Sequence, residues 1–198
     1  MPPGGGISPE AGSYIMVVEF MDARDSLEIQ VNNDPRNPPV AGQYAAVKER
    51  YDRWAKAVTT SSDGFDQLKQ AHTTLKRIQK QFAQVEDSLK TDMTTLADSL
   101  GKAITEIQHR YMLPQGTKGY NDESDLLSTY MWSARSHLDN GAGLPTQNGL
   151  YALKQYEAKV EEIRTDINAL FEGLWMEWRK AVEALELPPL FEDIEKLD

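Results

Sequence analysis

The sequence has no cysteine, and this absence excludes several kinds of chemistry at once. A chain without thiols forms no disulfides, holds no metal through thiolates and has no cysteine nucleophile. The compartment stays open, because many exported bacterial proteins also lack cysteine. At 198 residues the chain is still long enough to bury a core without covalent cross-links.

Histidine is scarce too, and the common catalytic motifs are missing. The three histidines are His72, His109 and His137. Glu106 and His109 have the Glu-x-x-His spacing of ferritin-like di-iron helices, but such a site needs a second copy of the motif, which the sequence lacks, and two further glutamates. We interpret the pair as surface groups; a di-iron enzyme remains the alternative that bound metal would reveal.

The motifs that bind phosphates or activate a serine do not occur in the sequence either. We find no glycine-rich phosphate loop of either common type and no Gly-x-Ser-x-Gly. Pairs of carboxylates such as Glu161 and Glu162, or Glu183 and Glu186, are interpreted as solvated charges on helix surfaces, because acid-base catalysis needs a cleft. We therefore expect no catalytic residue, no cofactor and no metal, so that the chain is not an enzyme in its own right.

An acidic charge balance and the lack of long apolar runs narrow the possible partners. The chain has 21 basic and 31 acidic residues, a formal charge of −10, and its lysines alternate with carboxylates along the expected helices. This pattern argues against a nucleic acid partner. No apolar run reaches the roughly 20 residues of a membrane span, so we expect no membrane span. Residues 1–12 lack the features of a signal peptide and are interpreted as a linker.

Residues 13–32 alternate between apolar and polar side chains with the period of β-strands. The pattern predicts a hairpin with a polar turn at residues 22–25. Two strands alone are marginal in water, so we expect the hairpin to lean on helices or to complete a larger sheet. The Asn- and Pro-rich segment after it breaks regular structure, and we place the hairpin region at residues 13–36.

From residue 40 to residue 186 the apolar residues follow helical spacing. The pattern predicts an elongated antiparallel bundle of three or four long helices with coiled-coil-like packing. Residues 61–64 could interrupt the first helix. We expect a helix-to-helix turn at residues 87–92, with one continuous rod as the alternative, and a loop at residues 112–122. Thr146 is the expected N-cap of the last long helix, which ends near Leu185 and leaves residues 187–198 as a tail.

The four tryptophans are the strongest candidates for a binding surface, because aromatic residues anchor both cores and interfaces. Trp54 and Trp178 fall on apolar stripes and are expected in the core. Trp132 and Trp175 each lie one step off a stripe, so we predict that they are partly exposed and that one of them contributes to an interface.

Short motifs in the expected order resemble a known bacterial family. They are Gly12-Ser13-Tyr14, Val31 followed by Asp34-Pro35-Arg36, Leu75 to Ile78, Leu144-Pro145-Thr146 and Leu187-Pro188. This order is similar to the C-terminal region of large proteins with sortilin-type, Asp-box (BNR) β-propellers that are labelled glycosyl hydrolases. The resemblance implies that the hairpin ends a β-sandwich and that the chain is periplasmic or secreted. Any hydrolytic chemistry would then belong to upstream domains.

Two functions follow as hypotheses. In the first, the chain is a non-catalytic C-terminal module of a larger exported propeller protein, and its partners are the upstream domains, another protein, or a second copy in a homodimer. In the second, it is a free-standing helical adaptor or chaperone-like protein that binds a partner helix.

Overall fold

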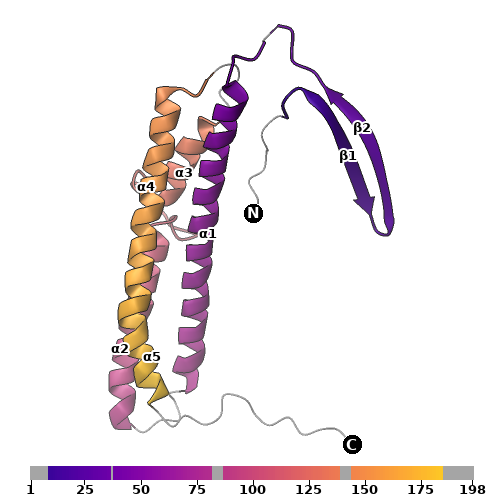
Figure 1. The fold of residues 1–198 in the computed structure, drawn as a ribbon. Helices are drawn as coiled ribbons and strands as arrows, with labels where there is room; N and C mark the ends of the chain where they lie inside the picture. Colours follow the sequence, from indigo (N-terminus) through magenta and orange to yellow (C-terminus); the bar gives the residue numbers. More distant parts are fainter. Residues whose placement is uncertain (1–8, 37, 82–86, 139–143, 185–198) are drawn as a thin grey trace, which may run out of the picture. The chain divides into compact units, whose positions relative to one another are not determined.

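The computed structural model describes residues 9–36, 38–81, 87–138 and 144–184. Within these ranges the chain is mainly helical and begins with an antiparallel β-hairpin, as predicted (Figure 1). The chain divides into two compact units, residues 1–58 with 130–157 and residues 59–129 with 158–198.

The hairpin consists of β1 (Gly12–Phe20) and β2 (Ala23–Val31). The register runs without a bulge from Gly12 opposite Val31 to Phe20 opposite Ala23. The prediction of a turn at residues 22–25 is therefore wrong. The strands are joined by the two-residue turn Met21–Asp22. A two-residue loop matches the twist of paired strands, and Met21 adopts the positive φ of 52° that such a turn needs at its first position. Residues 23–25 instead belong to β2.

In the first unit, the beginning of α1 (Gln43–Gln81) packs with α3 (Leu127–Ser136) and the beginning of α4 (Gln147–Leu170). Contacts fix the direction of α4, because Arg50 lies near Gly149 and Arg53 forms an ion pair of 2.6 Å with Glu157. From the first contact to the second, the residue numbers increase in both helices, so α4 runs in the same direction as α1. The predicted cap is confirmed, since the Gly149 amide donates to Thr146 Oγ1 at 3.1 Å.

One buried cation ties the helices of this unit together. Arg50 is almost fully buried, and its guanidinium donates to the carbonyl oxygen of Leu138, just after α3. A cation near the last carbonyls of a helix is stabilised by their partial negative charge. Arg135 lies over the rings of Tyr51 and Trp54, 5.9 Å and 5.8 Å from their centroids.

In the second unit, α2 (Asp87–His109) packs against the later part of α1. The pairing is antiparallel, because Gln79 donates to Asp98 while Phe65 stacks on Tyr111 at 5.0 Å (Figure 1). Small residues let the two helices come close, and a Cβ added to Gly101 would lie 3.4 Å from Leu75.

Two predicted helix breaks are wrong. Residues 61–64 lie inside α1, which continues without interruption to Gln81. Neighbouring side chains leave no room for a larger residue at Gly64, because an added Cβ would lie 3.0 Å from Ile167 Cδ1 and from Tyr111 Oη. Residues 87–92, where a turn was predicted, form the first turns of α2. Residues 82–86, between α1 and α2, lie outside the described ranges.

The predicted apolar seam of the last helix is buried along α4, from Leu153 to Leu170. Beyond α4 the chain forms a π-helical turn, η2 (Phe171–Trp175), and then α5 (Met176–Glu183). The wider turn shifts the phase of the helix, so Leu174 is only half-buried while Trp178 is buried again. The predicted end near Leu185 and the tail at residues 187–198 lie outside the described ranges.

The loop between α2 and α3 is closed at its base by backbone hydrogen bonds. The amides of Leu127 and Ser128 donate to the carbonyls of Arg110 and Tyr111, at 2.9 Å and 3.0 Å. These bonds join the first turn of α3 to the two residues that follow α2, and they give acceptors to amides that a helix start normally leaves without partners. None of the helices in the described ranges combines the length and hydropathy that a membrane-spanning helix requires.

Candidate functional site

The most unusual surface of the described chain is one side of the hairpin. Residues of even number on β1 and their odd-numbered partners on β2 share one side of the sheet. We define the apolar face as Tyr14, Met16, Val18, Phe20, Leu27 and Ile29. The same alternation that predicted the strands therefore produces a largely apolar surface, in which Asp25, opposite Val18, is the charged residue.

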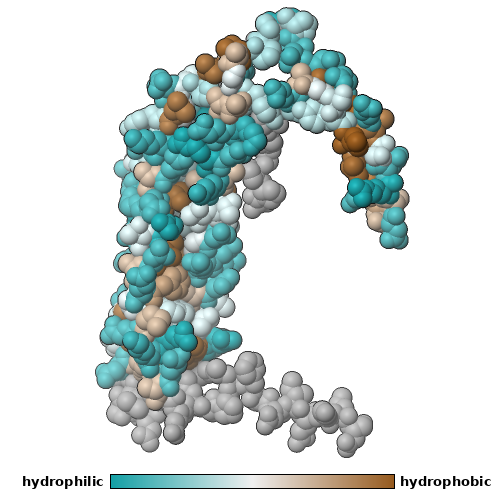
Figure 2. Space-filling view, viewed as in Figure 1, coloured by the Kyte–Doolittle hydropathy of each residue, from teal (hydrophilic) through white to brown (hydrophobic). Residues whose placement is uncertain are grey.

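This apolar face is exposed to solvent. The exposed fraction is 70% for Phe20, 59% for Leu27 and 55% for Val18, whereas the apolar residues of the helical seams are almost fully buried. Figure 2 shows apolar side chains at the surface of the hairpin. Contiguous exposed apolar surface of this kind marks interaction sites in soluble proteins.

The opposite face of the hairpin is more polar. It carries an ion pair between Arg24 and Glu19 at 3.3 Å and a hydrogen bond from Ser13 Oγ to Gln30 Oε1 at 2.6 Å. Ile15 and Val17 also lie on this face and are exposed. The difference between the faces gives the hairpin one side suited to water and one suited to burial.

The two edges of the hairpin differ in charge. Among the described residues the sheet has only two strands, so each strand has an outer edge without a neighbouring strand. Residues 11–18, most of β1, include no charged residue, whereas β2 carries Arg24, Asp25 and Glu28. Charged side chains on an edge strand discourage pairing with further strands. The β2 edge is protected in this way and the β1 edge is not.

Two of the four tryptophans are buried, and the other two are at least partly exposed. Trp54 and Trp178 are buried, as expected. Trp132, on α3, is 66% exposed, and Trp175, in η2, is half-buried between Phe171 and Trp178, with ring centroids 5.6 Å and 5.2 Å away. The partial exposure of both residues is confirmed, and their interface role stays a prediction. They belong to different units.

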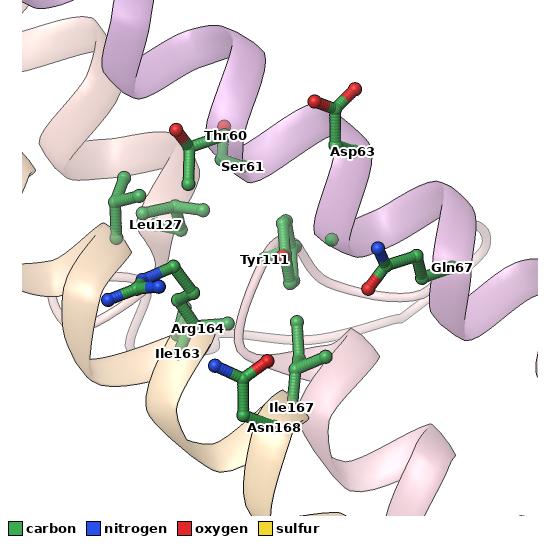
Figure 3. A pocket seen from close by; sticks show the side chains of 12 residues that line it. Thr60, Ser61, Asp63, Gln67, Tyr111, Leu127, Ile163, Arg164, Ile167 and Asn168 are labelled. Carbon is green, nitrogen blue, oxygen red and sulfur yellow. The ribbon is translucent and has the colours of Figure 1, made fainter. Parts of the chain in front are cut away.

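A small hollow lies in the second unit, where α1 contributes short side chains (Figure 3). Its volume is about 260 Å³, and Thr60, Ser61 and Gly64 line it from α1. Tyr111 and Ile167 form part of its apolar wall, and Figure 3 shows Arg164 and Asn168 beside it on α4. Arg164 is already paired with Glu161 at 2.6 Å. The hollow thus arises from the small residues whose sequence pattern suggested a helix break.

A second, shallow groove between α1 and α2 includes His72, Glu106 and His109 among its lining residues. Burial, and then the nearby positive charge of Lys76, lower the pKa of His72, so its neutral form is favoured. Within the described ranges no cluster of three or more histidine or carboxylate side chains has the geometry of a metal site. The Glu106 and His109 pair gains no further ligand in this groove.

The other buried charge, Lys159, belongs to a group that anchors the loop before α3. Its ammonium contacts Asp125 at 2.9 Å and Glu162 at 3.4 Å, and Arg110 pairs with both Glu162 and Asp166. Burial alone would lower the pKa of Lys159, but the hydrogen bond and charge of Asp125, with Glu162, outweigh it and raise the pKa above its usual value. All these groups are paired, so they stabilise the fold and offer no free reactive group.

Sequence reasoning identified the hairpin and offered two alternatives for it, contact with the helices or completion of a larger sheet. It allowed the strands to lean on the helices, whereas their apolar side chains are exposed. The missed signal was the absence of charge from residues 11–18 next to a charged second strand. Comparison of the chain with protein-family models, with curated proteins and with solved structures gave no match.

Proposed function

We propose that this chain is a non-catalytic interaction module whose hairpin packs its apolar face against a β-sheet of another domain in a larger exported protein. The observation that carries the proposal is the exposure of a whole strand face, from Tyr14 to Phe20 on β1 and at Leu27 on β2. Such a face is stable only when something covers it.

The energy available from covering this face is large. Fully burying one side chain of the size of Leu, Met or Phe contributes about 1.5–3 kcal/mol, and five members of the apolar face are substantially exposed. Part of this gain is offset by the loss of freedom on docking. The remainder is still sufficient to fix the hairpin on a partner.

A β-sheet is the partner that fits the geometry best. The two strands pair regularly over nine residue pairs, and the apolar face has the period-2 spacing of the inner face of a sandwich. Sheets pack face to face at about 10 Å with interdigitating side chains, which the alternating Met16, Val18 and Phe20 on β1 would provide.

The family resemblance supports the same partner. In the proteins that it suggests, a β-sandwich follows a β-propeller, and the hairpin would be the end of that sandwich. The parent would then be a periplasmic or secreted propeller protein labelled a glycosyl hydrolase, and its chemistry would reside in the propeller. The helical units would stabilise, dock or dimerise the parent.

Hydrogen-deuterium exchange tests this proposal. The hairpin amides are compared between the 198-residue chain and the parent gene product that includes the residues encoded upstream. We expect slower exchange of the β1 and β2 amides in the parent protein, at least tenfold, because docking removes the open state. Equal exchange in both proteins, or a gene with no upstream β domain, would refute the proposal.

Two substitutions refine the test. Met16→Asp places a charge on the apolar face and should abolish the added protection in the parent protein. Ser26→Asp places the same charge on the opposite face at nearly the same height of the hairpin, and should leave the protection intact. Equal loss of protection in both variants would indicate general disruption of the hairpin and would argue against docking through this face.

A free-standing helical adaptor is the second candidate, and the exposure of Trp132 on α3 favours it. In that case a partner helix would bind α3 through Trp132, and a gene that starts at Met1 with no preceding domain is expected. Loss of partner binding in Trp132→Ala, with unchanged helical content, would identify this function.

A further inference from the structure

Among the described residues, the outer edge of β1 has no neighbouring strand, and this edge is a second surface, distinct from the apolar face. We propose that it pairs with the β1 edge of a second copy of this chain, antiparallel and two-fold symmetric, with Met16 opposite Met16 of the other copy. The result is a four-stranded sheet in the order β2, β1, β1, β2. This inference extends the proposed interaction function from the face of the hairpin to its edge.

Charge distinguishes the two edges. From Gly12 to Val18 the β1 strand has no charged side chain, and its regular pairing with β2 includes no bulge to turn the edge away. Native proteins protect open edges with charges, proline or bulges, and β2 has the first of these in Arg24, Asp25 and Glu28. Pairing through β1 therefore removes no charge from water except at Glu19, at the end of the strand.

The β1 sequence is compatible with its own copy in this register. With Met16 at the two-fold axis, Ile15 lies opposite Val17 of the other copy, and Tyr14 opposite its Val18. Glu19 lies opposite Ser13, so no like charges face each other. Residues directly opposite in an antiparallel pair point to the same side of the sheet, so the two apolar faces join into one.

Strand number gives the physical reason for the association. A two-stranded hairpin is marginal in water, and three or more strands with an apolar face are needed for independent stability. The described chain supplies two strands, and the second copy supplies the other two. The joined apolar face remains available for the sheet partner proposed above, because edge pairing does not cover it.

Sedimentation velocity of the purified 198-residue chain is the first measurement. We expect a concentration-dependent equilibrium between monomer and dimer. Val17→Lys puts a charge on the β1 edge and should weaken the dimer at least tenfold. Ser26→Lys is the matched control, because Ser26 is the direct partner of Val17 on the protected strand, and should leave the dimer unchanged.

Cysteine cross-linking fixes the register, because the natural chain contains no cysteine. Residues directly opposite in an antiparallel pair have Cα atoms about 4.5–5.5 Å apart, within the range that a disulfide spans. Met16→Cys should therefore form a disulfide-linked dimer on mild oxidation. Leu27→Cys is on the same face but one strand from the edge, and its two copies would be about 14 Å apart, too far to link.

The outcomes separate this proposal from its alternatives. A monomer at hundreds of micromolar, or equal cross-linking of Met16→Cys and Leu27→Cys, overturns edge pairing. Cross-linking of Leu27→Cys alone would indicate face-to-face association of hairpins and would overturn it as well. None of these results affects the exchange test of the parent protein, so failure of the edge proposal is distinguishable from failure of the proposed function.

Discussion

The helices and the hairpin have the same kind of sequence pattern, but the apolar residues of the helices are buried and those of the hairpin are exposed. Both are amphipathic, with apolar residues at the period of their own secondary structure. The helical stripes from α1, α2 and α4 meet one another and are buried, with Leu68, Leu100 and Leu153 fully inaccessible. The apolar residues of the hairpin face, among them Phe20 and Leu27, are exposed.

This difference shows that amphipathicity does not by itself mean that a segment belongs to a core. Several helices can enclose their stripes between them, whereas a single two-stranded sheet has no second layer with which to cover its face. The helical part therefore contains its own source of stability.

The strongest test of this contrast pairs one substitution from each region. Leu100→Ala in α2 should cost about 2–5 kcal/mol of unfolding free energy, because it opens a cavity at a fully buried site. Met16→Ala on the hairpin should change the unfolding free energy by less than about 0.5 kcal/mol. Urea unfolding followed by circular dichroism at 222 nm measures both. A large effect of Met16→Ala would mean that the hairpin packs on the helices in solution.

A glycine substitution tests how tightly the second unit is packed. Gly64→Ala should stabilise a bare helix by about 1 kcal/mol. In this fold we expect a net loss of about 1–3 kcal/mol, because the new Cβ would lie 3.0 Å from Ile167 and Tyr111. Gly173→Ala, where nothing lies within 4 Å of the new Cβ, is the control and should not destabilise. A stabilised Gly64→Ala variant would show that the unit is looser than described.

The Lys159 group should make the second unit sensitive to alkali. Because the fold raises the pKa of Lys159, its contribution is complete below the unfolded-state pKa of about 10.4 and is lost as the pH rises through the folded-state pKa. Lys159→Met should cost about 1 kcal/mol at pH 7 and reduce the alkaline loss. Thermal unfolding between pH 7 and pH 11 measures this effect, with the exposed Lys154→Met as control. Identical pH profiles for Lys159→Met and the natural chain would contradict it.

The smallest expected effect is that of Trp132→Ala. Trp132 is 66% exposed, so its removal should change the unfolding free energy by less than about 0.5 kcal/mol. Trp54→Ala, at a buried position, should cost about 3–5 kcal/mol and provides the comparison. Equal losses in the two variants would place Trp132 in the core and remove it as an interface candidate.

Most helices could be predicted from the sequence because their periodicity is long and regular. The seam from Leu153 to Leu170 and the cap at Thr146 agree with the pattern, since each depends on residues close together in the chain. The break expected at residues 61–64 failed for a non-local reason. Gly64 and its short neighbours have the composition of a loop, but they lie inside α1. In the folded chain Ile167 and Tyr111 occupy the space beside Gly64.

Only part of the candidate surface could be predicted from the sequence. Alternation located the strands, but the hairpin turn was placed too late, because Ala23 to Asp25 look polar although they pair with β1. The sequence does not tell whether an amphipathic strand is covered, since this depends on which other layers are present. The interface roles of Trp132 and Trp175 likewise depend on partners that one chain does not contain.

The loop between α2 and α3 has a consequence for engineering. Because Leu127 and Ser128 bond directly to Arg110 and Tyr111, the helices are joined at the base of the loop whatever the length of the segment above it. Tyr120, near the middle of that segment, is 99% exposed. Lengthening an already closed loop costs only about 0.6 kcal/mol for each doubling. A fluorescent label or a small reporter domain inserted beside Tyr120 would therefore report on the module while leaving its helices and its hairpin unchanged.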